Sequence, residues 1–358
     1  MRRRWMPLVL ALLVLISAAA GSALARGELV VHYIDVGQGE AALLQGPGFA
    51  ILIDAGNIGG REVLDYLTQL QVEAIDLLVV THPHADHIGQ AAEVLRTFPV
   101  REVWMSGYEH YTKAFEELLD AVLDSDADYF EPRAGFERSY GELELQVLNP
   151  PQGELSRNVH ETCLMLKAVY GQIAFLFTGD AEQRTEKALV AQGLPLQAHV
   201  LQLGHHASRT SSALEFLVAV EPDAAVYSAG VGNDFGHPHP EVLNRLKILE
   251  IPVYGTDRYG TIVVRTDGQT YSLETEKKGQ LNEEDILGGV DLNTASWEEL
   301  QLIIHIGPER AGQIIEEREK RPFRSVDELK ERIKGIGEKT LAEIKAQGLV
   351  CVKGVNGY

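Results

Sequence analysis

The sequence is poor in cysteine and in positive charge, and after its first 20 residues it has no long hydrophobic run. Its 358 residues include two cysteines, Cys163 and Cys351. Two are too few for a disulfide framework or a cysteine-rich zinc fold. Lysine and arginine total 32 against 52 aspartates and glutamates, for a net charge of −20, which excludes a protein that coats nucleic acid through bulk positive charge. A metal site must therefore use histidine and carboxylate, and a nucleic-acid contact must be local.

The sequence does contain enough apolar residues for folded domains. They make up 45% of the chain, which excludes a mainly disordered protein, and the length suits two domains of about 100–200 residues each. From residue 28 to about 275, short apolar segments typical of strands alternate with amphipathic segments typical of helices. We expect strands at residues 29–34, 50–53, 77–80, 173–177 and 200–203, and helices at 61–70, 114–123 and 241–249.

A polar stretch at residues 276–289 indicates a linker, after which residues 290–352 have a helical pattern throughout. Two related segments, IGPERA at 306–311 and IGEKTL at 336–341, lie 30 residues apart and indicate two similar helix-turn-helix units. Residues 288–358 contain 11 Lys or Arg and 12 Asp or Glu, and the first 27 residues carry four arginines. Residues 28–287 therefore carry a net charge of −23. The sequence predicts an acidic α/β domain followed by a nearly neutral helical one.

Residues 1–25 have the pattern of a signal peptide. Three arginines precede an apolar run at 5–20, and Ala-Leu-Ala stands before Arg26. The run is short for a membrane span and contains Pro7, so we favour cleavage over a permanent anchor. The expected location is secreted or extracytoplasmic, without a stable membrane span after cleavage, and cell-envelope association follows if the leader is retained. Export would permit a Cys163–Cys351 disulfide, although the apolar neighbours of Cys163 favour a buried thiol.

Four candidate metal ligands lie within six residues, in the segment THPHADHIG at 81–89. Alternate side chains of an extended segment share a face, so His82 and His84 can hold one ion. The turn into the next helix directs Asp86 and His87 towards a second ion. Asp180 and His205 each follow a predicted strand, where a sheet fixes side-chain positions.

These segments resemble the metallo-β-lactamase superfamily, and within it the extracytoplasmic hydrolase domain of ComEC-type DNA-uptake proteins. The similarity rests on six segments in family order, which together extend over nearly all of residues 28–275: DVGQGE at 35–40, LIDAG at 52–56, residues 82–89, FTGD at 177–180, GHHAS at 204–208 and FGHP at 235–238. The resemblance implies an αββα sandwich with metal ions at one edge of the paired sheets.

The resemblance also implies ligands for two ions. It places His82, His84 and Asp180 at the first, and Asp86, His87, Asp180 and His205 at the second. His160 fits a further histidine of the first ion, although the ComEC-type pattern has Asn-x-x-Ser where this chain has HETC at 160–163; the alternative is a solvent-facing or substrate-contacting residue. Asp54 resembles an aspartate that steadies the histidine loop.

Several histidines are expected to lie outside the ligand set. His206 is expected to pack or hydrogen-bond behind the ligands, because adjacent residues point apart. His237 is a candidate for holding a substrate oxyanion or protonating a leaving group, or is an ordinary loop histidine. For His32, His110, His199 and His239 we expect ordinary packed or surface positions.

Two adjacent divalent cations would make a water molecule nucleophilic and neutralise charge on a phosphate ester. Asp86 is the candidate for orienting that water. The imidazole-rich ligand set favours zinc, with manganese as the alternative because carboxylates share the site.

The C-terminal segment, approximately residues 290–352, resembles the tandem helix-hairpin-helix domain of ComEA-type DNA receptors. In such hairpins, glycines and helix N-termini contact phosphates without reading the base sequence. The candidate DNA-binding residues lie in the two hairpins: Ile306, Gly307, Gly335, Ile336, Gly337 and Lys339. The first hairpin departs from the pattern because His305 stands where the leading glycine is expected. The alternative is that these glycines only turn the chain between packed helices.

The sequence thus predicts an exported metal-dependent phosphodiesterase, a DNA nuclease linked to extracellular DNA processing or uptake. Its C-terminal domain would bind DNA independently of sequence, and the DNA-uptake machinery is a candidate partner. One alternative is a hydrolase of another ester, such as a lactone or β-lactam, because one fold supports several chemistries. The other is a non-catalytic DNA-capture receptor.

Overall fold

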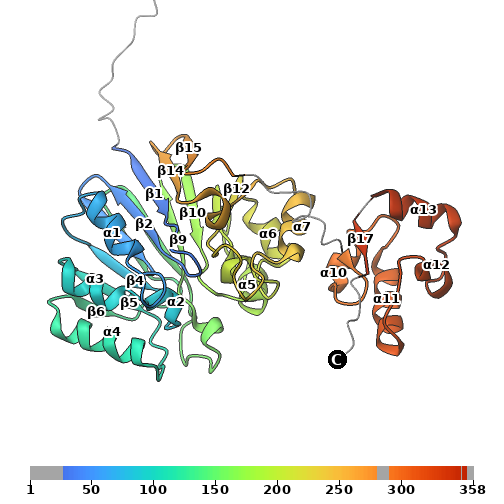
Figure 1. Cartoon of the computed structure of the whole chain (residues 1–358), viewed down its shortest axis with the longest axis horizontal. Coiled ribbons are helices and arrows are strands. Elements are labelled where there is room, and N and C mark those ends of the chain that lie inside the picture. Colours follow the sequence, from blue (N-terminus) through green and yellow to red (C-terminus); the bar gives the residue numbers. More distant parts are fainter. Residues whose placement is uncertain (1–26, 280–289, 348, 353–358) are drawn as a thin grey trace, which may run out of the picture.

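The computed structural model describes residues 27–279, 290–347 and 349–352. The predicted signal peptide at 1–25 and most of the predicted linker at 276–289 lie outside these ranges. In the described part, two β-sheets pack face to face between two layers of helices, and a small helical domain follows (Figure 1). The predicted αββα sandwich with a C-terminal helical domain is confirmed, and each predicted strand and helix of the large domain occurs within one residue of its expected bounds.

The first sheet has the strand order β15-β14-β1-β2-β3-β4-β5-β6. Strands β3 to β6 run parallel, whereas the pairs from β15 to β3 are antiparallel. Its strands are β1 (Leu29–Tyr33), β2 (Ala42–Gly46), β3 (Phe49–Ile53), β4 (Leu77–Val80), β5 (Glu102–Met105), β6 (Asp128–Phe130), β14 (Ile262–Thr266) and β15 (Tyr271–Thr275).

The second sheet has the order β13-β12-β11-β10-β9-β8-β7, and its strands β10 to β13 run parallel. Its strands are β7 (Glu137–Tyr140), β8 (Leu143–Asn149), β9 (Met165–Tyr170), β10 (Ile173–Phe177), β11 (Val200–Gln202), β12 (Ala224–Tyr227) and β13 (Val253–Gly255). The central strands of both sheets are buried on two faces, which accounts for continuous apolar strands such as Ile173–Phe177.

Helices cover the outer faces of the two sheets. On the first sheet lie α1 (Glu62–Gln69), α3 (Ala91–Thr97) and α4 (Lys113–Asp124); on the second lie α5 (Gln183–Ala191), α6 (Leu214–Val220) and α7 (Pro240–Ile248). Short helical turns occur at α2 (Ala85–Ile88), α8 (Thr256–Tyr259), η1 (Val159–Thr162) and η2 (Gly204–Ala207). Thr112 begins α4 by accepting a hydrogen bond from the Phe115 N–H.

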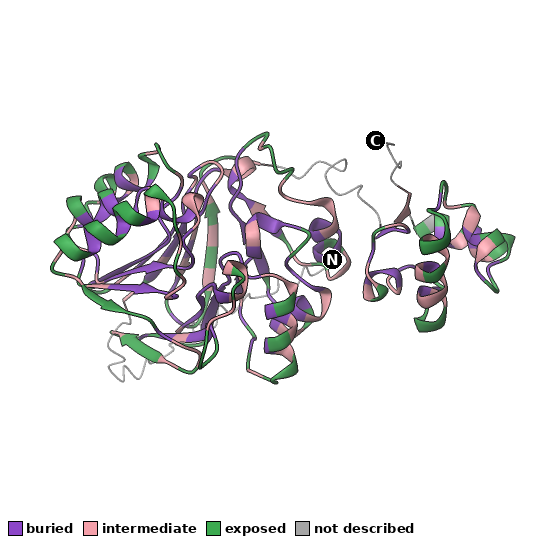
Figure 2. Ribbon diagram, turned by 90° about the horizontal axis from the view of Figure 1, so that it is seen from below, coloured by how far each residue is buried: buried purple, intermediate pink, exposed green. Residues whose placement is uncertain are grey.

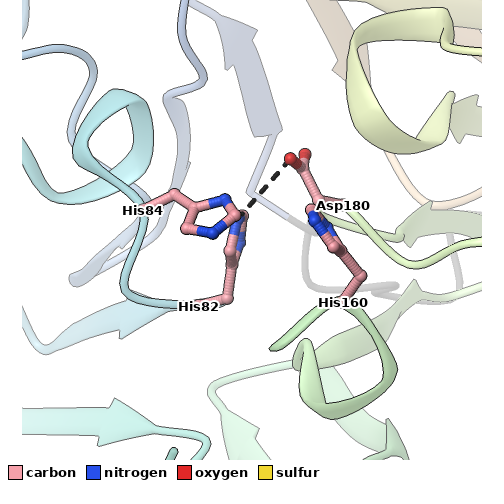
Figure 3. A group of neighbouring side chains, drawn as sticks. All are labelled: His82, His84, His160 and Asp180. Carbon is pink, nitrogen blue, oxygen red and sulfur yellow. Dashed lines mark ion pairs between the residues drawn. The ribbon is translucent and has the colours of Figure 1, made fainter. Parts of the chain in front are cut away.

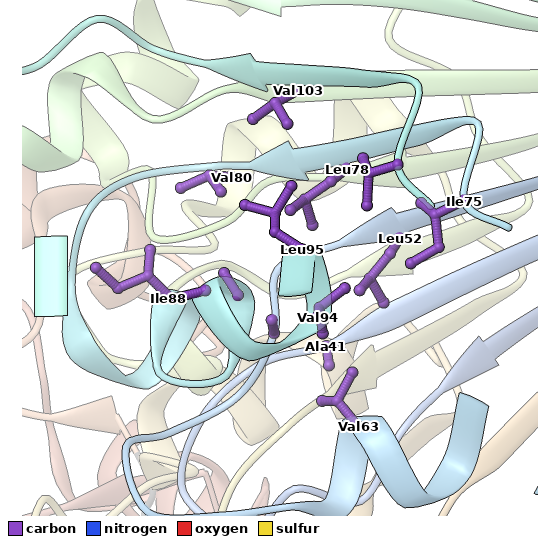
Figure 4. Packing of buried hydrophobic residues seen from close by; sticks show 14 of the residues in the cluster. Ala41, Leu52, Val63, Ile75, Leu78, Val80, Ile88, Val94, Leu95 and Val103 are labelled. Atoms are coloured by element: carbon purple, nitrogen blue, oxygen red, sulfur yellow. The ribbon is translucent and has the colours of Figure 1, made fainter. Parts of the chain in front are cut away.

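The apolar residues of the large domain form three layers. One lies between the first sheet and its helices, with Leu52, Leu78 and Val94 at its centre (Figure 4). A second fills the space between the sheets around Trp104 and Phe175, and a third lies between the second sheet and its helices. Figure 2 shows the same pattern, with buried strands inside and exposed outer faces on the helices. These layers hold the strand ends, and the loops that follow them, in fixed positions.

The C-terminal domain has its own core, which includes Ile314, Phe323 and Leu329. Its elements are β16 (Val290–Asp291), α10 (Trp297–Leu300), α11 (Pro308–Lys320), α12 (Glu328–Arg332), α13 (Glu338–Gln347) and β17 (Val350–Cys351). The starts of α11 and α13 reproduce the 30-residue repeat. The expectation of a wholly helical segment is wrong in one detail, because β16 and β17 pair in parallel. Cys163 is fully buried, as expected, and in the described part of the chain no disulfide joins it to Cys351.

A buried ion pair joins the two domains. The Arg245 guanidinium on α7 donates to Glu299 on α10, from Nε to Oε1 over 2.6 Å, and its second arm also contacts that oxygen. Arg245 further donates to the carbonyls of Ser211 and Ser212, at 3.0 and 2.9 Å. Glu299 also caps α10, since its Oε2 accepts from the Ser296 N–H. One carboxylate therefore both begins a helix of the C-terminal domain and connects that domain to the larger one.

No helix in the described ranges has the length and hydrophobicity that a membrane crossing requires.

Candidate metal centre

Polar loops from both sheets meet at one edge of the sandwich. Residues 81–84 follow β4, Asp180 follows β10 and residues 205–206 follow β11, so all three come from carboxyl ends of parallel strands. Backbone hydrogen bonds connect these loops, from Leu164 N to Thr81 O at 2.8 Å and from His205 N to Gly179 O at 3.0 Å. The loops are therefore held at fixed separations by both sheets.

The first group of candidate ligands comprises His82, His84, His160 and Asp180, which offer donor atoms within 4.8 Å of one another. Figure 3 shows the loop that carries His82 and His84 facing the separate segments that carry His160 and Asp180. His82 Nε2 lies 3.5 Å from Asp180 Oδ2. His82 Nε2 and His160 Nδ1 are buried and make no hydrogen bond among the described residues. Buried nitrogens without a partner are costly, and a cation would satisfy them.

The second group comprises Glu40, His87, Asp180 and His206, with donor atoms again within 4.8 Å. His87 Nε2 lies 3.2 Å from Asp180 Oδ1, and His206 Nε2 lies 3.8 Å from the same oxygen. Asp86 Oδ2 lies 3.1 Å from His206 Nε2. Asp180 thus faces the first group with one oxygen and the second group with the other, which is the position that a bridging carboxylate requires.

The second group contains His206, whereas the sequence-based expectation places His205 with Asp86 and His87. His206 is the buried member of the pair, and its ring packs 5.3 Å from that of His87. His205 lies on the side of the first group: its ring stacks on His160 at 4.7 Å, and its Nε2 is 3.5 Å from Asp180 Oδ2. His205 also forms a third cluster with His160 and Glu182. That His205 is a ligand of the second ion stays a prediction. The geometry supports His206 better than His205 in this role.

Partners behind the candidate ligands set the orientation of the imidazoles. Asp54 accepts from the Thr81 N–H and from the Thr81 hydroxyl, at 2.8 and 2.7 Å, and from His87 Nδ1 at 2.7 Å. His206 Nδ1 donates to the Ser228 carbonyl at 2.9 Å. In both histidines Nδ1 is occupied, so Nε2 points into the site, as metal-binding histidines usually do. Asp54 lies behind the site, as its resemblance implies.

The electrostatics of the cluster also favour a cation. Burial lowers the pKa of His82, and burial followed by the neighbouring His160 lowers the pKa of His84 to about 4. Burial opposes the charged form of His87, but Asp180 and Asp54 raise its pKa above the ordinary value. For His206, burial is likewise outweighed by Asp180 and Asp86, which raise the pKa to about 9. The carboxylates thus hold positive charge in the second group, and a metal ion would replace those protons.

Glu40 is a member of the second group that no sequence motif singled out as a ligand. It is fully buried, its Oε2 lies 4.0 Å from His206 Nδ1, and burial raises its pKa to about 8. Its place in the DVGQGE segment was the available signal. Glu40 lies 42 residues before His82 in the sequence. Its position in the segment therefore did not indicate which side chains it would contact.

His237 lies beside the second group. Its ring is 5.8 Å from the rings of both His205 and His206. Burial, followed by His206 and His239, lowers its pKa to about 4. The ring is therefore neutral near pH 7, which suits it to donating a hydrogen bond better than to protonating a leaving group.

Of the four histidines expected to be ordinary, three have such roles. His32 pairs with the Tyr66 hydroxyl, His199 Nδ1 accepts from the Ala174 N–H, and His239 Nδ1 accepts from the Arg209 N–H. His110 differs, because its ring lies 5.8 Å from that of His84 at the rim of the first group.

The two hairpins of the C-terminal domain present open backbone in front of helix N-termini. Gly307 precedes α11 and Gly337 precedes α13, and the space that a Cβ would occupy at either glycine is empty. Gly335 and Lys339 are exposed, whereas Ile306 and Ile336 are buried in the core. The isoleucine side chains therefore pack in the core beneath the hairpins. The groups available to contact a phosphate are the exposed backbone and Lys339.

His305 takes the same conformation as the glycine that it replaces. Its φ is 67°, against 83° for Gly335 in the second hairpin. His305 Nε2 pairs with Glu343 Oε2 at 2.6 Å. Arg310 donates to the carbonyls of His305, Lys334 and Gly335, at 2.6, 3.3 and 3.1 Å, and so ties the two hairpins together.

Comparison with known proteins agrees with both domains. The chain matches the Metallo-beta-lactamase superfamily over residues 34–231 and the Helix-hairpin-helix motif over residues 287–347. ComE operon protein 3 of Bacillus subtilis (strain 168) is 30% identical over 256 residues, which cover 66% of this chain and 33% of that protein. Competence protein ComA of Neisseria gonorrhoeae is 29% identical over 243 residues, which cover 67% of this chain and 33% of that protein.

A protein named deoxyribonuclease from Thioalkalivibrio sp. (strain K90mix) is 47% identical over 66 residues, which cover 18% of this chain and 17% of that protein. The matched segment amounts to about a third of the length of the two competence-related relatives. The sequence match, the paired sheets and the His/Asp cluster at their edge together show that this chain belongs to the metallo-β-lactamase superfamily, with a helix-hairpin-helix domain attached.

Proposed function

We propose that the protein is an exported metal-dependent phosphodiesterase, specifically a DNA nuclease of extracellular DNA processing or uptake. The observation that carries this proposal is the position of Asp180 between two groups of buried histidines, in a chain that also has a helix-hairpin-helix domain. The names of the competence-related relatives and of the deoxyribonuclease support DNA as the substrate. The leader pattern at residues 1–25 supports export, and the DNA-uptake machinery is the proposed partner.

The proposed ligands of the first cation are His82, His84, His160 and Asp180. Those of the second are Asp86, His87, Asp180 and His206, with His205 as the alternative to His206. Zinc is the proposed metal and manganese the alternative. When bound, two adjacent divalent cations supply a nucleophilic water and neutralise charge on a phosphate.

The protein's own groups would then position the substrate. Asp86 is partly exposed and faces His206 at 3.1 Å, so its carboxylate can accept a hydrogen bond from a water molecule and orient it. His237 is neutral and lies beside the second group, so it can donate a hydrogen bond to a phosphate oxygen. The hairpins at Gly307 and Gly337 would hold the sugar-phosphate backbone away from this edge.

The test uses purified full-length protein loaded with zinc or with manganese, incubated with single-stranded and duplex DNA and analysed on gels. Cleavage should vanish after chelation, return with the metal and fall at least a hundredfold in His84→Ala. His199→Gln is the matched control, since His199 lies outside the cluster. Hydrolysis of nitrocefin without release of nucleotides would favour the lactone or β-lactam alternative. Tight duplex binding by metal-loaded protein, without cleavage under either ion, would favour the capture receptor.

A further inference from the structure

The loop between β12 and α7 is held in one shape by a single side chain. Asn233 Nδ2 donates to the carbonyls of Gly230 and His237, at 2.9 and 2.6 Å. Its Oδ1 accepts from the backbone N–H groups of Phe235 and His237, at 3.2 and 3.0 Å. Gly230 N in turn donates to Gln38 Oε1 at 3.1 Å. Because Gln38 lies between β1 and β2, this hydrogen bond connects the loop to the first sheet. The tip of this loop is therefore positioned relative to the candidate metal centre.

The fixed loop presents an aromatic ring to solvent. Phe235 is 64% exposed. Its ring stacks on that of His237 with centroids 5.7 Å apart and an interplanar angle of 19°. His237 stacks in turn on His206 at 5.8 Å and 28°. Three nearly parallel rings thus lead from the surface to the second group of candidate ligands.

This arrangement suits a flat, uncharged ligand surface. Phe235 has one face on His237, and its exposed side has no hydrogen-bonding group, so what it can offer a ligand is stacking and apolar contact. The large domain is strongly acidic, so attraction for phosphates is weak away from the metal centre. Base–aromatic stacking needs no positive charge and tolerates every base. In duplex DNA the faces of the bases are covered by their neighbours, so an accessible base face belongs to unpaired DNA.

We propose that Phe235 is a stacking platform for an unpaired nucleobase next to the phosphate at the metal centre, and that it gives the enzyme a preference for single-stranded DNA. This inference rests on the proposed nuclease function and names the substrate form that the site takes. Phe235 is a positioning residue here, because it acts on the base and not on the reacting phosphate.

The experiment compares metal-loaded full-length wild type, Phe235→Ala and Phe235→Trp. We measure KM and kcat on a single-stranded oligonucleotide, on its duplex and on bis(p-nitrophenyl) phosphate, which has no base. For Phe235→Ala we expect KM on the single strand to rise roughly tenfold with kcat little changed, which corresponds to a loss of about 1.4 kcal/mol of stacking free energy from one base. The tryptophan variant should restore the wild-type KM. The ratio of single-strand to duplex kcat/KM should fall by a similar factor in the alanine variant.

Val231→Ala provides the matched control, since Val231 belongs to the same loop, is 83% exposed and makes no ring stack. A second readout is the fluorescence of 2-aminopurine in a phosphorothioate single strand, which should be quenched on binding by wild type and not by Phe235→Ala. If wild type cleaves DNA while Phe235→Ala keeps both its KM and its strand preference, the stacking inference is wrong and the nuclease proposal stands. If wild type cleaves no DNA but hydrolyses bis(p-nitrophenyl) phosphate, the nuclease proposal itself is wrong.

Discussion

The ion pair between Arg245 and Glu299 predicts a strong energetic coupling between the two domains. The side chains are 6% and 11% exposed, so each charge depends on the other for compensation. Removing one member of a buried ion pair costs about 3–5 kcal/mol, because the remaining charge is left without a partner. Since about 1.4 kcal/mol corresponds to a factor of ten, the opening equilibrium of the domain junction should rise by two to three orders of magnitude.

The substitution Glu299→Gln removes the ion pair but keeps the helix cap, so it measures the ion pair alone. Glutamine at this position still completes a capping box with Ser296, so the start of α10 remains hydrogen-bonded while the negative charge is lost. Arg245→Met removes the other charge and also the donors to Ser211 and Ser212. In the double variant no charge is left unpaired, so its cost should be smaller than the sum of the single costs by about 2 kcal/mol or more.

Hydrogen exchange measured by mass spectrometry provides the assay. The amides of Leu300 and Gln301, which donate within the α10 turn, report opening of the junction. The amides of α13 are the internal control, because that helix packs within the core of the C-terminal domain. The conclusion that this ion pair holds the domains together would be refuted if the cost of the double variant equalled the sum of the two single costs. It would also be refuted if the α10 amides of the single variants exchanged at the wild-type rate.

Three further predictions concern the metal centre and its support. His206→Ala should lose one of two bound metal ions by elemental analysis, whereas His205→Ala should retain both; the opposite result would restore the sequence-based assignment. Because Asp180 and its neighbours raise the pKa of His87, and that of His206 to about 9, metal binding near pH 7 must displace protons. Affinity measured by chelator competition should therefore increase as the pH rises from 7 to 9, and a flat profile would contradict this. Burial raises the pKa of Glu186, which accepts from the Ser212 and Ala213 N–H groups, to about 7. The folded chain then holds a proton that the unfolded chain releases above about pH 4.5, so this contribution to stability is complete below that pH and is lost as the pH rises through 7. Glu186→Gln should flatten the dependence of the urea midpoint on pH over this range, and an unchanged slope would exclude Glu186 as its source.

The part of the site that the sequence predicted is the part that local spacing controls. His82 and His84 alternate along an extended segment, and α2 begins at Ala85, so the separation of the two histidines from Asp86 and His87 follows from backbone geometry alone. Asp180 was recognisable because it follows a fully buried strand. The alternation of apolar strands with amphipathic helices predicted an α/β domain, whereas the αββα order of its layers was implied by the resemblance to the metallo-β-lactamase superfamily.

What the sequence did not indicate depends on unusual backbone and on distant contacts. His205 and His206 both have positive φ, at 52° and 56°, so the direction of each side chain cannot be read from an ordinary turn or strand. Glu40 reaches the second group only because the chain returns from β1 to β2 beside the histidine loop. The Arg245–Glu299 pair joins residues 54 positions apart, and no periodic pattern connects them.

The pairing of β16 with β17 has a mechanical consequence. It places the first and last described strands of the helix-hairpin-helix domain side by side, Val290 against Val350 and Asp291 against Cys351. The described part of that domain therefore begins and ends at the same strand pair. Under the proposed function, tension along a DNA strand held by the hairpins would reach the larger domain through the Arg245–Glu299 pair. Arg245 also donates to the carbonyl of Ser211, and the Ser211 hydroxyl in turn donates to the carbonyl of Ala181, the neighbour of Asp180. This series of hydrogen bonds ends at Ala181, one residue from the Asp180 carboxylate that faces both groups of ligands.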